Sequence, residues 1–227
     1  MSTILVVAAH PDDEILGVGA TIVKHIKKGD KAYALVLGEG QTSRTDKRSG
    51  TDASVVEALH SDSERAAAII GFEKLYLENL PDNRFDEWDL LDVVKVVEKY
   101  VKEIKPDIIY THHGGDLNVD HQYTYKAVMT ATRPVNNCPV KEIYCFETVS
   151  STEWNFAYGD DAFKPNVFVD VTDTFDVKLE AMKEYKSELA EFPHPRSLEN
   201  LSLCAKRWGG VTGCQYVEAF EVMRVIK

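Results

Sequence analysis

The side chains that could do chemistry gather in two groups, each directly after an expected strand. The first group follows the apolar run at residues 4–9 and contains His10, Asp12, Asp13 and Glu14. The second group follows a short strand-like run at residues 107–111 and contains His112, His113, Asp116, Asn118, Asp120 and His121. Carboxylates crowded at one place repel each other, and a bound metal ion is the simplest charge that offsets this repulsion. Both groups therefore indicate metal chemistry.

One metal ion could take its ligands from both groups. His10 and Asp13 are close in sequence, and His121 could supply a third ligand. Two imidazoles, a carboxylate and an open position for water describe a catalytic zinc site. Zinc lowers the pKa of such a water towards about 7, and a neighbouring carboxylate can take its proton. Asp12 is the candidate for this general base, and ferrous iron or another divalent ion could replace zinc.

Ordinary structural roles and a nucleotide site are the competing interpretations. A lone loop histidine such as His10 usually has no chemical role, and Glu14 would suit the first turn of a helix by charge alone. The joint occurrence of both groups at strand ends favours a site. Gly17 and Gly19 follow the first strand as in a dinucleotide-binding turn, but Ile22 occupies the third glycine position. Carboxylates there would also repel a pyrophosphate, so we reject a nicotinamide cofactor.

The elements needed to position these groups alternate between strand and helix. Apolar runs and alternation predict strands at residues 4–9, 31–37, 74–77, 107–111, 141–149, 166–171 and 218–226. Helical spacing predicts helices at residues 15–26, 61–70, 90–104, 174–189 and 197–208, and another that ends before Pro134. This alternation predicts an α/β fold, a three-layer α/β/α sandwich with a mostly parallel sheet.

Local signals predict where several of these elements begin. Ser61 with Glu64 forms a capping box that is expected to start the second helix. Thr174 and Ser197 are the expected caps of the last two helices. The polar residues 38–53 predict a long connection, and such loops are often functional.

Composition restricts the classes of protein that fit. The 227 residues suit one domain, and the formal net charge of −11 argues against nucleic acid as a partner. There is no basic amphipathic face for an anionic membrane surface and no apolar run long enough for a transmembrane segment. The cysteines form no CxxC pair and the N-terminus lacks the pattern of a secretion signal, which favours a cytoplasmic protein with reduced thiols. A periplasmic chain matured from a longer precursor is the alternative.

Two motifs resemble a known family. AHPDDE after the first strand, joined to the downstream DLNVDH, resembles the PIG-L family of zinc-dependent de-N-acetylases, also called LmbE-like proteins. The likeness extends over nearly the whole chain and implies a single domain at residues 1–227 with a Rossmann-like sandwich. It implies hydrolysis of the N-acetyl group of an amino sugar such as N-acetylglucosamine, or of a sugar conjugate, with release of acetate and a free amine. It also implies His10, Asp13 and His121 as metal ligands and Asp12 as general base.

The second motif departs from the family pattern at Asn118. Many members carry a histidine at this position, three residues before the last ligand. An asparagine amide can donate a hydrogen bond to an oxyanion, but it cannot act as a general acid at neutral pH. The leaving amine must then receive its proton from Asp12, or from one of the candidate histidines His112, His113 and His194.

Further residues are expected to support the reaction or the substrate. Asp120, and with it Asp116, is expected to orient the metal ligands or to contact substrate hydroxyls. Arg44, Arg133 and Arg196 could meet a phosphate on the substrate. The sugar could be free, nucleotide-linked or lipid-linked, and the chain could form a homo-oligomer. The rival functions are a metal-dependent amidase acting on a non-sugar or other N-acyl substrate and a catalytically lapsed sugar- or metal-binding protein.

Overall fold

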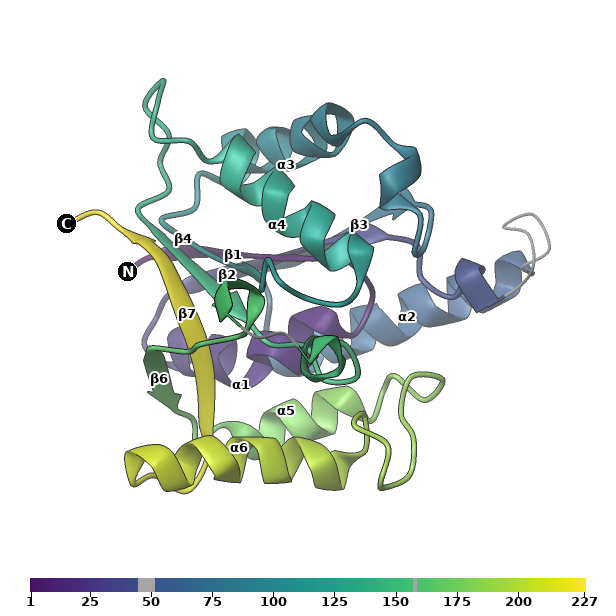
Figure 1. The fold of residues 1–227 in the computed structure, drawn as a ribbon, viewed down its shortest axis with the longest axis vertical. Helices are drawn as coiled ribbons and strands as arrows, with labels where there is room; N and C mark the ends of the chain where they lie inside the picture. Colours follow the sequence, from purple (N-terminus) through teal and green to yellow (C-terminus); the bar gives the residue numbers. More distant parts are fainter. Residues whose placement is uncertain (45–51, 157–158) are drawn as a thin grey trace.

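The structure, a computed structural model, describes residues 1–44, 52–156 and 159–227, and its centre is one mixed β-sheet (Figure 1). Within these residues, seven strands lie in the order β3-β2-β1-β4-β5-β7-β6. The strands are β1 (Thr3–Ala8), β2 (Lys31–Gly38), β3 (Lys74–Leu80), β4 (Ile108–His112), β5 (Glu142–Phe146), β6 (Val167–Asp170) and β7 (Val217–Val225). Strands β1 to β5 pair in parallel, and β7 runs antiparallel to β5 and β6. The prediction of an α/β fold with a mostly parallel sheet is confirmed.

Helices cover both faces of this sheet, as Figure 1 shows. They are α1 (Asp13–Lys27), α2 (Ala53–Ile70), α3 (Leu90–Ile104), α4 (Val119–Ala131), α5 (Phe175–Met182) and α6 (Leu198–Thr212). Leu5 and Val7 of β1 pack with α3 and α4, whereas Ile4 and Val6 pack with α1, α2 and α5. Because β1 is buried on both faces, its sequence is a continuous apolar run. In the described part of the chain, no helix is long and apolar enough to cross a membrane.

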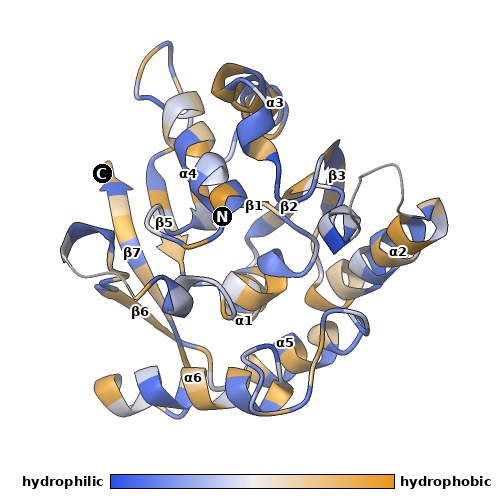
Figure 2. Ribbon diagram, turned by 45° about the vertical axis from the view of Figure 1, so that its right-hand side comes forward, coloured by the Kyte–Doolittle hydropathy of each residue, from blue (hydrophilic) through white to orange (hydrophobic). Residues whose placement is uncertain are grey.

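The outer helices are amphipathic and keep a polar side in water. Figure 2 shows hydrophilic and hydrophobic residues alternating along α2 and α3. The apolar face of α3 buries Val93, Val94, Val97 and Val101. Its chain leaves the helix at Lys105, whose φ of 52° is left-handed, and Pro106 follows directly. The predicted span of this helix is confirmed.

The predicted start of the second helix is wrong. Helix α2 begins at Ala53, and the Asp52 side chain accepts a hydrogen bond of 2.9 Å from the Ser54 N–H. Ser61 lies inside the helix and donates instead to the carbonyl of Glu57 at 3.0 Å. A serine followed by an acid three residues later also occurs mid-helix, where the hydroxyl bonds to the preceding turn. Residues 45–51 of the predicted polar connection lie outside the described residues.

The later helices also differ from their predicted spans. Helix α4 begins at Val119, where the Asn118 side chain caps it. Ser197 caps α6 as predicted, by accepting from the Asn200 N–H at 3.0 Å. Helix α5 ends at Met182, although apolar spacing continues to Leu189. The residues from 183 to 197 therefore form a long irregular connection between α5 and α6.

Helix α1 lies unusually close to the sheet because of Gly17. A Cβ atom at this position would stand 2.2 Å from the ring of Phe146 on β5. Phe146 is fully buried, so no ordinary side chain fits at this position without moving the core. Gly17 is therefore a packing residue, and this close packing fixes the helix that carries Asp13 at its start.

A buried ion pair between Lys178 and Glu218 also holds α1 in place. The Lys178 ammonium donates to Glu218 at 2.6 Å and to the carbonyl of Leu16 at 2.7 Å. Glu218 also accepts from the backbone N–H of Thr21 at 2.7 Å. Charges that are taken out of water need such complete pairing. The last strand and α5 thus hold α1 in place behind the carboxyl end of β1.

Candidate active site

The two predicted groups meet because β1 and β4 are parallel neighbours. Val7 on β1 pairs with Thr111 on β4, so the loops after both strands leave the sheet at the same edge. His10 follows β1, Asp13 opens α1, and His121 lies in the first turn of α4. The structure therefore brings together the side chains that the sequence separates by more than a hundred residues.

His10, Asp13 and His121 offer donor atoms that suit one metal ion. One donor from each residue lies within 4.8 Å of the other two. Asp13 Oδ2 is 3.4 Å from His10 Nδ1 and 3.3 Å from His121 Nε2. Donors placed about 2.0–2.1 Å from a tetrahedral zinc ion would lie about 3.3–3.4 Å apart. The spacing and the donor types thus fit a divalent cation such as zinc.

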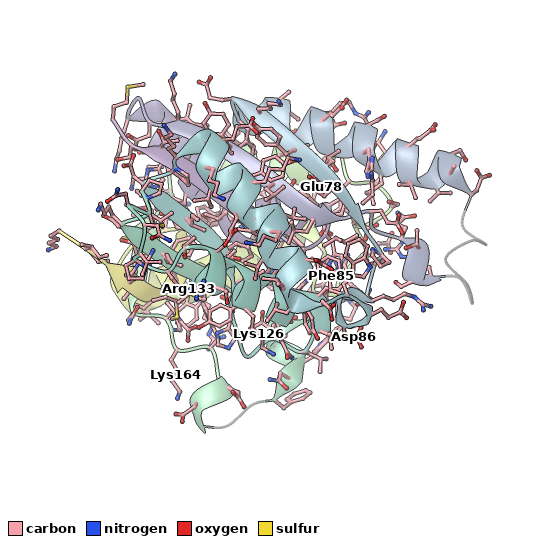
Figure 3. The ribbon with its side chains drawn as sticks, turned by 90° about the horizontal axis from the view of Figure 1, so that it is seen from above. Glu78, Phe85, Asp86, Lys126, Arg133 and Lys164 are labelled. Atoms are coloured by element: carbon pink, nitrogen blue, oxygen red, sulfur yellow. The ribbon has the colours of Figure 1, made fainter. Side chains whose placement is uncertain are left out.

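Carboxylates hold the far sides of both imidazoles. His10 Nε2 lies 2.9 Å from Asp120 Oδ2, and His121 Nδ1 lies 3.2 Å from Asp116 Oδ1. Asp120 is itself fixed, because its Oδ1 accepts the Phe85 N–H at 2.9 Å. Figure 3 labels Phe85, which belongs to the short helix η3 (Phe85–Glu87) packed against α4. A carboxylate behind a metal-binding imidazole fixes its tautomer and orientation.

The electrostatics of this cluster favour a positive charge. Burial opposes the ionisation of Asp13, but the imidazoles of His121 and His112 hold the pKa of this carboxyl well below its usual value. Burial lowers the pKa of His121, whereas Asp13 and Asp116 raise it, and the resulting pKa is about 9. A metal ligand must be a neutral imidazole, so a divalent cation would replace this proton.

Asp12 lies beside this cluster in a strained backbone conformation. Its φ is 106°, a left-handed region that costs a non-glycine residue about 1–3 kcal/mol. The buried Glu14 carboxylate accepts the Asp12 N–H at 3.1 Å, and Arg196 Nη1 donates to Asp12 Oδ2 at 3.1 Å. Burial raises the pKa of Asp12 well above its usual value, while Arg196 opposes this rise and Asp13 adds to it. A carboxylate with a raised pKa is a better proton acceptor near neutral pH.

A cavity of about 140 Å³ opens onto Asp12 and the metal-binding cluster. Of the predicted site residues, those that line it are His10, Asp12, Asp13, Asn118 and His121. Asp120 does not line it, because Asp120 lies behind His10. Polar side chains make up most of the remaining wall, and they are Gln41, Ser43, Arg44, Asp82, Asn83, Thr148, Ser150, Ser151, Glu188 and Arg196.

The three candidate histidines do not face this cavity. His112 is fully buried; its Nε2 accepts the Ala9 N–H at 2.9 Å, and burial lowers its pKa to about 3. His113 uses Nδ1 for Glu221 at 2.6 Å and Nε2 for the carbonyl of Asp161 at 2.9 Å. His194 accepts the Arg196 N–H and lies edge-on to the Trp154 ring. These placements do not favour any of the three as the proton donor to a leaving group.

Asn118 combines a structural role with a place at the cavity. Its side-chain oxygen accepts the Asp120 N–H at 2.8 Å and so caps α4. Its amide nitrogen donates to Asn83 Oδ1 at 2.9 Å. Since an amide nitrogen carries two hydrogens, this bond uses only one of them.

Two acidic residues of the cavity wall, Asp82 and Glu188, were not predicted as site residues from the sequence. Asp82 follows the carboxyl end of β3, and its Oδ1 lies 3.3 Å from His10 Nε2. The strand-end rule that found His10 could also have found Asp82. Glu188, from the connection between α5 and α6, has no such signal. Of the predicted phosphate contacts, Arg44 and Arg196 line the cavity, whereas Arg133, labelled in Figure 3, does not.

This geometry suits a metal-dependent hydrolase: histidine and aspartate donors that could hold a metal ion lie at strand ends, with a buried carboxylate beside them. The family model described as PIG-L, GlcNAc-PI de-N-acetylase, matches residues 5–132, which is more than half of the chain. The chain belongs to the PIG-L family.

Individual relatives agree with this assignment. The uncharacterized deacetylase YaiS of Escherichia coli K12 is 33% identical over 190 residues, which cover 81% of this chain and 90% of YaiS. Diacetylchitobiose deacetylase from Thermococcus kodakarensis is 25% identical over 228 residues, which cover 95% and 80% of the two chains.

Solved structures share the fold at lower identity. N,N'-diacetylchitobiose deacetylase from Pyrococcus horikoshii has a TM-score of 0.79 and 21% identity, with 98% of this chain and 84% of that chain covered. The 4-carboxy-2-hydroxymuconate hydratase from Pseudomonas putida has a TM-score of 0.71 and 22% identity, with 100% and 99% covered. Because this fold also occurs in a hydratase, the reaction must be argued from the site.

Proposed function

We propose that this protein removes the N-acetyl group from an N-acetylated amino sugar or sugar conjugate, and that zinc is its metal. The observation that carries the proposal is the buried Asp12 carboxylate beside the donor set of His10, Asp13 and His121, all on one cavity. The family description and the diacetylchitobiose deacetylase relative support an N-acetylated sugar as the substrate. The polar cavity wall suits a ligand rich in hydroxyl groups.

The proposed roles follow from these positions. A zinc ion held by His10, Asp13 and His121 would polarise the acetyl carbonyl and acidify the attacking water. Asp12 accepts a proton from this water while the water oxygen bonds to the acetyl carbon. The bond from this carbon to nitrogen then breaks, and protonated Asp12 returns the proton to the leaving amine. Asn118 donates its second amide hydrogen to the developing oxyanion.

Neighbouring carboxylates orient the side chains of the proposed site. Asp120 and Asp116 orient His10 and His121 through the ring nitrogens that do not face Asp13. Glu14 holds the strained backbone of Asp12 through the Asp12 N–H. Buried polar contacts therefore support His10 and the Asp12 backbone, and Asp116 lies beside the His121 ring.

Release of acetate and primary amine tests the proposal. The panel contains free, nucleotide-linked and lipid-linked N-acetylated amino sugars, together with non-sugar N-acyl amides. Each substrate is incubated with zinc-loaded protein, with chelated protein and with the Asp12→Asn variant. We expect release from at least one N-acetylated sugar with zinc-loaded protein only.

The other outcomes identify the rival functions. Turnover confined to non-sugar amides, or to another acyl group, would establish a metal-dependent amidase instead. Saturable sugar binding without turnover would establish a lapsed enzyme. Full activity of Asp12→Asn would reject Asp12 as the base.

A further inference from the structure

The connection between α5 and α6 brings a second set of charged side chains to the cavity. It spans residues 183–197 and lies at the right-hand ends of α5 and α6, below α2, in Figure 1. Two of its residues, Glu188 and Arg196, line the same cavity as Asp12. Neither is used by the proposed chemistry, although Arg196 contacts the proposed base and Glu188 contacts Arg196.

Arg196 joins three parts of the chain that are distant in sequence. Its Nη1 donates to Asp12 Oδ2 at 3.1 Å and to Glu188 Oε2 at 2.8 Å. Its Nε donates to Ser150 Oγ at 2.8 Å. The rigid planar guanidinium thus has a fixed direction, which a flexible ammonium group would not have.

Glu188 holds Arg196 in this direction. Its side chain is only 5% exposed, and Oε2 also accepts from Arg44 Nη2 at 2.6 Å. Its other oxygen accepts from Gln41 Nε2 at 2.8 Å. A buried carboxylate with several charge-assisted bonds is an immobile anchor. Arg196 is therefore part of a network rather than a mobile surface cation.

The contact with Arg196 also distinguishes the two carboxylate oxygens of Asp12. Arg196 occupies Oδ2, and across the described residues the Asp12 side chain makes no other hydrogen bond within the protein. A bond at Oδ2 restricts the rotation of the carboxylate and leaves Oδ1 to exchange protons with water and the leaving amine. A misplacement of about 1 Å at such a group can cost about 100-fold in rate.

We propose that Arg196, anchored by Glu188, is a positioning residue that fixes the Asp12 carboxylate for proton transfer. The inference rests on the proposed role of Asp12 as the general base. It also assigns Arg196 a role different from the phosphate contact expected from the sequence, because Arg196 is already bonded to two carboxylates. A substrate phosphate would have to displace one of them.

Steady-state kinetics of three zinc-loaded variants test this role. In Arg196→Gln we expect kcat to fall about 10- to 100-fold, with KM changed less than about threefold and with full zinc content. Arg196→Lys should recover part of kcat, because its ammonium can reach one carboxylate but cannot form all three bonds. The matched control is Arg65→Gln, which removes the 2.7 Å bond from α2 to Glu184 in the same connection and does not touch the cavity.

The outcomes separate this role from its alternatives. Wild-type kcat in Arg196→Gln would overturn the proposal. A rise in KM confined to phosphorylated substrates, with kcat unchanged, would also overturn it and make Arg196 a substrate contact. An equal loss of kcat in Arg65→Gln would show that the connection acts only through its general stability.

A measurement without substrate keeps the proposal distinct from the proposed function. The free energy of unfolding is measured in urea for Arg196→Gln, Asp12→Ala and the double variant. We expect the double variant to lose less stability than the sum of the two single losses, because each single change breaks the same contact. Strict additivity would reject the contact. If zinc-loaded wild type deacetylates nothing, the deacetylase function fails, and this cycle still decides whether Arg196 holds Asp12.

Discussion

Asp12 and Asp13 are neighbours in sequence and line the same cavity, yet their side chains have different neighbours. The metal side is the proposed donor set of His10, Asp13 and His121. Burial raises the pKa of Asp13, but the imidazoles around it hold this pKa well below the usual value. The base side is Asp12, the proposed base, with its contact Arg196. Burial raises the pKa of Asp12, Arg196 partly offsets this rise, and nearby carboxylates add to it. Two identical side chains thus acquire different proton affinities from their surroundings. The environment of each carboxylate, rather than its residue type, separates the proposed ligand Asp13 from the proposed base Asp12.

The two sides also differ in where their support comes from. The metal side is built from residues at strand ends and at the start of α4, and their supporting carboxylates lie in the same segments. The base side depends on Ser150, Glu188 and Arg196, which come from later loops. One side is therefore local to the two motifs, and the other depends on the complete fold.

The largest effect is expected from Asp13→Ala, which breaks the metal side. The variant loses the carboxylate that lies 3.3–3.4 Å from both imidazoles, so we expect loss of bound zinc and no detectable acetate release. Metal content by mass spectrometry and acetate release measure both. Retention of zinc at wild-type stoichiometry would show that the ligands lie elsewhere.

Asp12→Asn breaks the base side alone. An amide cannot accept the proton, so kcat should fall by about 10²- to 10⁴-fold while zinc content stays at the wild-type level. A simultaneous loss of zinc would mean that the two sides are not separable. Circular dichroism controls for the fold, since Asp12 has a strained backbone.

Asp120→Asn weakens the metal side without removing a proposed ligand, because it changes only the group behind His10. The variant retains an acceptor for the Phe85 N–H, but it can present an amide N–H to His10 Nε2 in place of a carboxylate. We expect zinc affinity or activity to fall about 10- to 100-fold. Competition with a chromophoric chelator measures the affinity, and an unchanged value with unchanged kcat would contradict the orienting role.

The smallest effect is expected from Gly17→Ala, which acts on both sides through α1. The added methyl group would press on the Phe146 ring, and such overpacking typically costs about 1–3 kcal/mol of unfolding free energy. Gly210→Ala in α6 is the matched control, because a Cβ there meets nothing within 4 Å. Urea unfolding compares the variants, and equal stability of the two would reject the packing role of Gly17.

The sequence predicts the metal side better than the base side, and the reason is physical. His10, Asp13 and His121 follow buried strands, and the carboxyl ends of parallel strands meet at one edge. The predicted start of α2 was wrong, because the pattern of Ser61 and Glu64 also occurs inside helices. Glu188 could not be predicted, since α5 ends earlier than its apolar spacing indicates and the chain then folds back irregularly.

The base-side support has an evolutionary consequence. The family model matches residues 5–132, so the connection at residues 183–197 lies wholly outside the matched region. The two sequence motifs can therefore be present in a chain whose connection differs. Exchanging this connection between relatives would change the contacts of the Asp12 carboxylate and leave the donor set of His10, Asp13 and His121 in place.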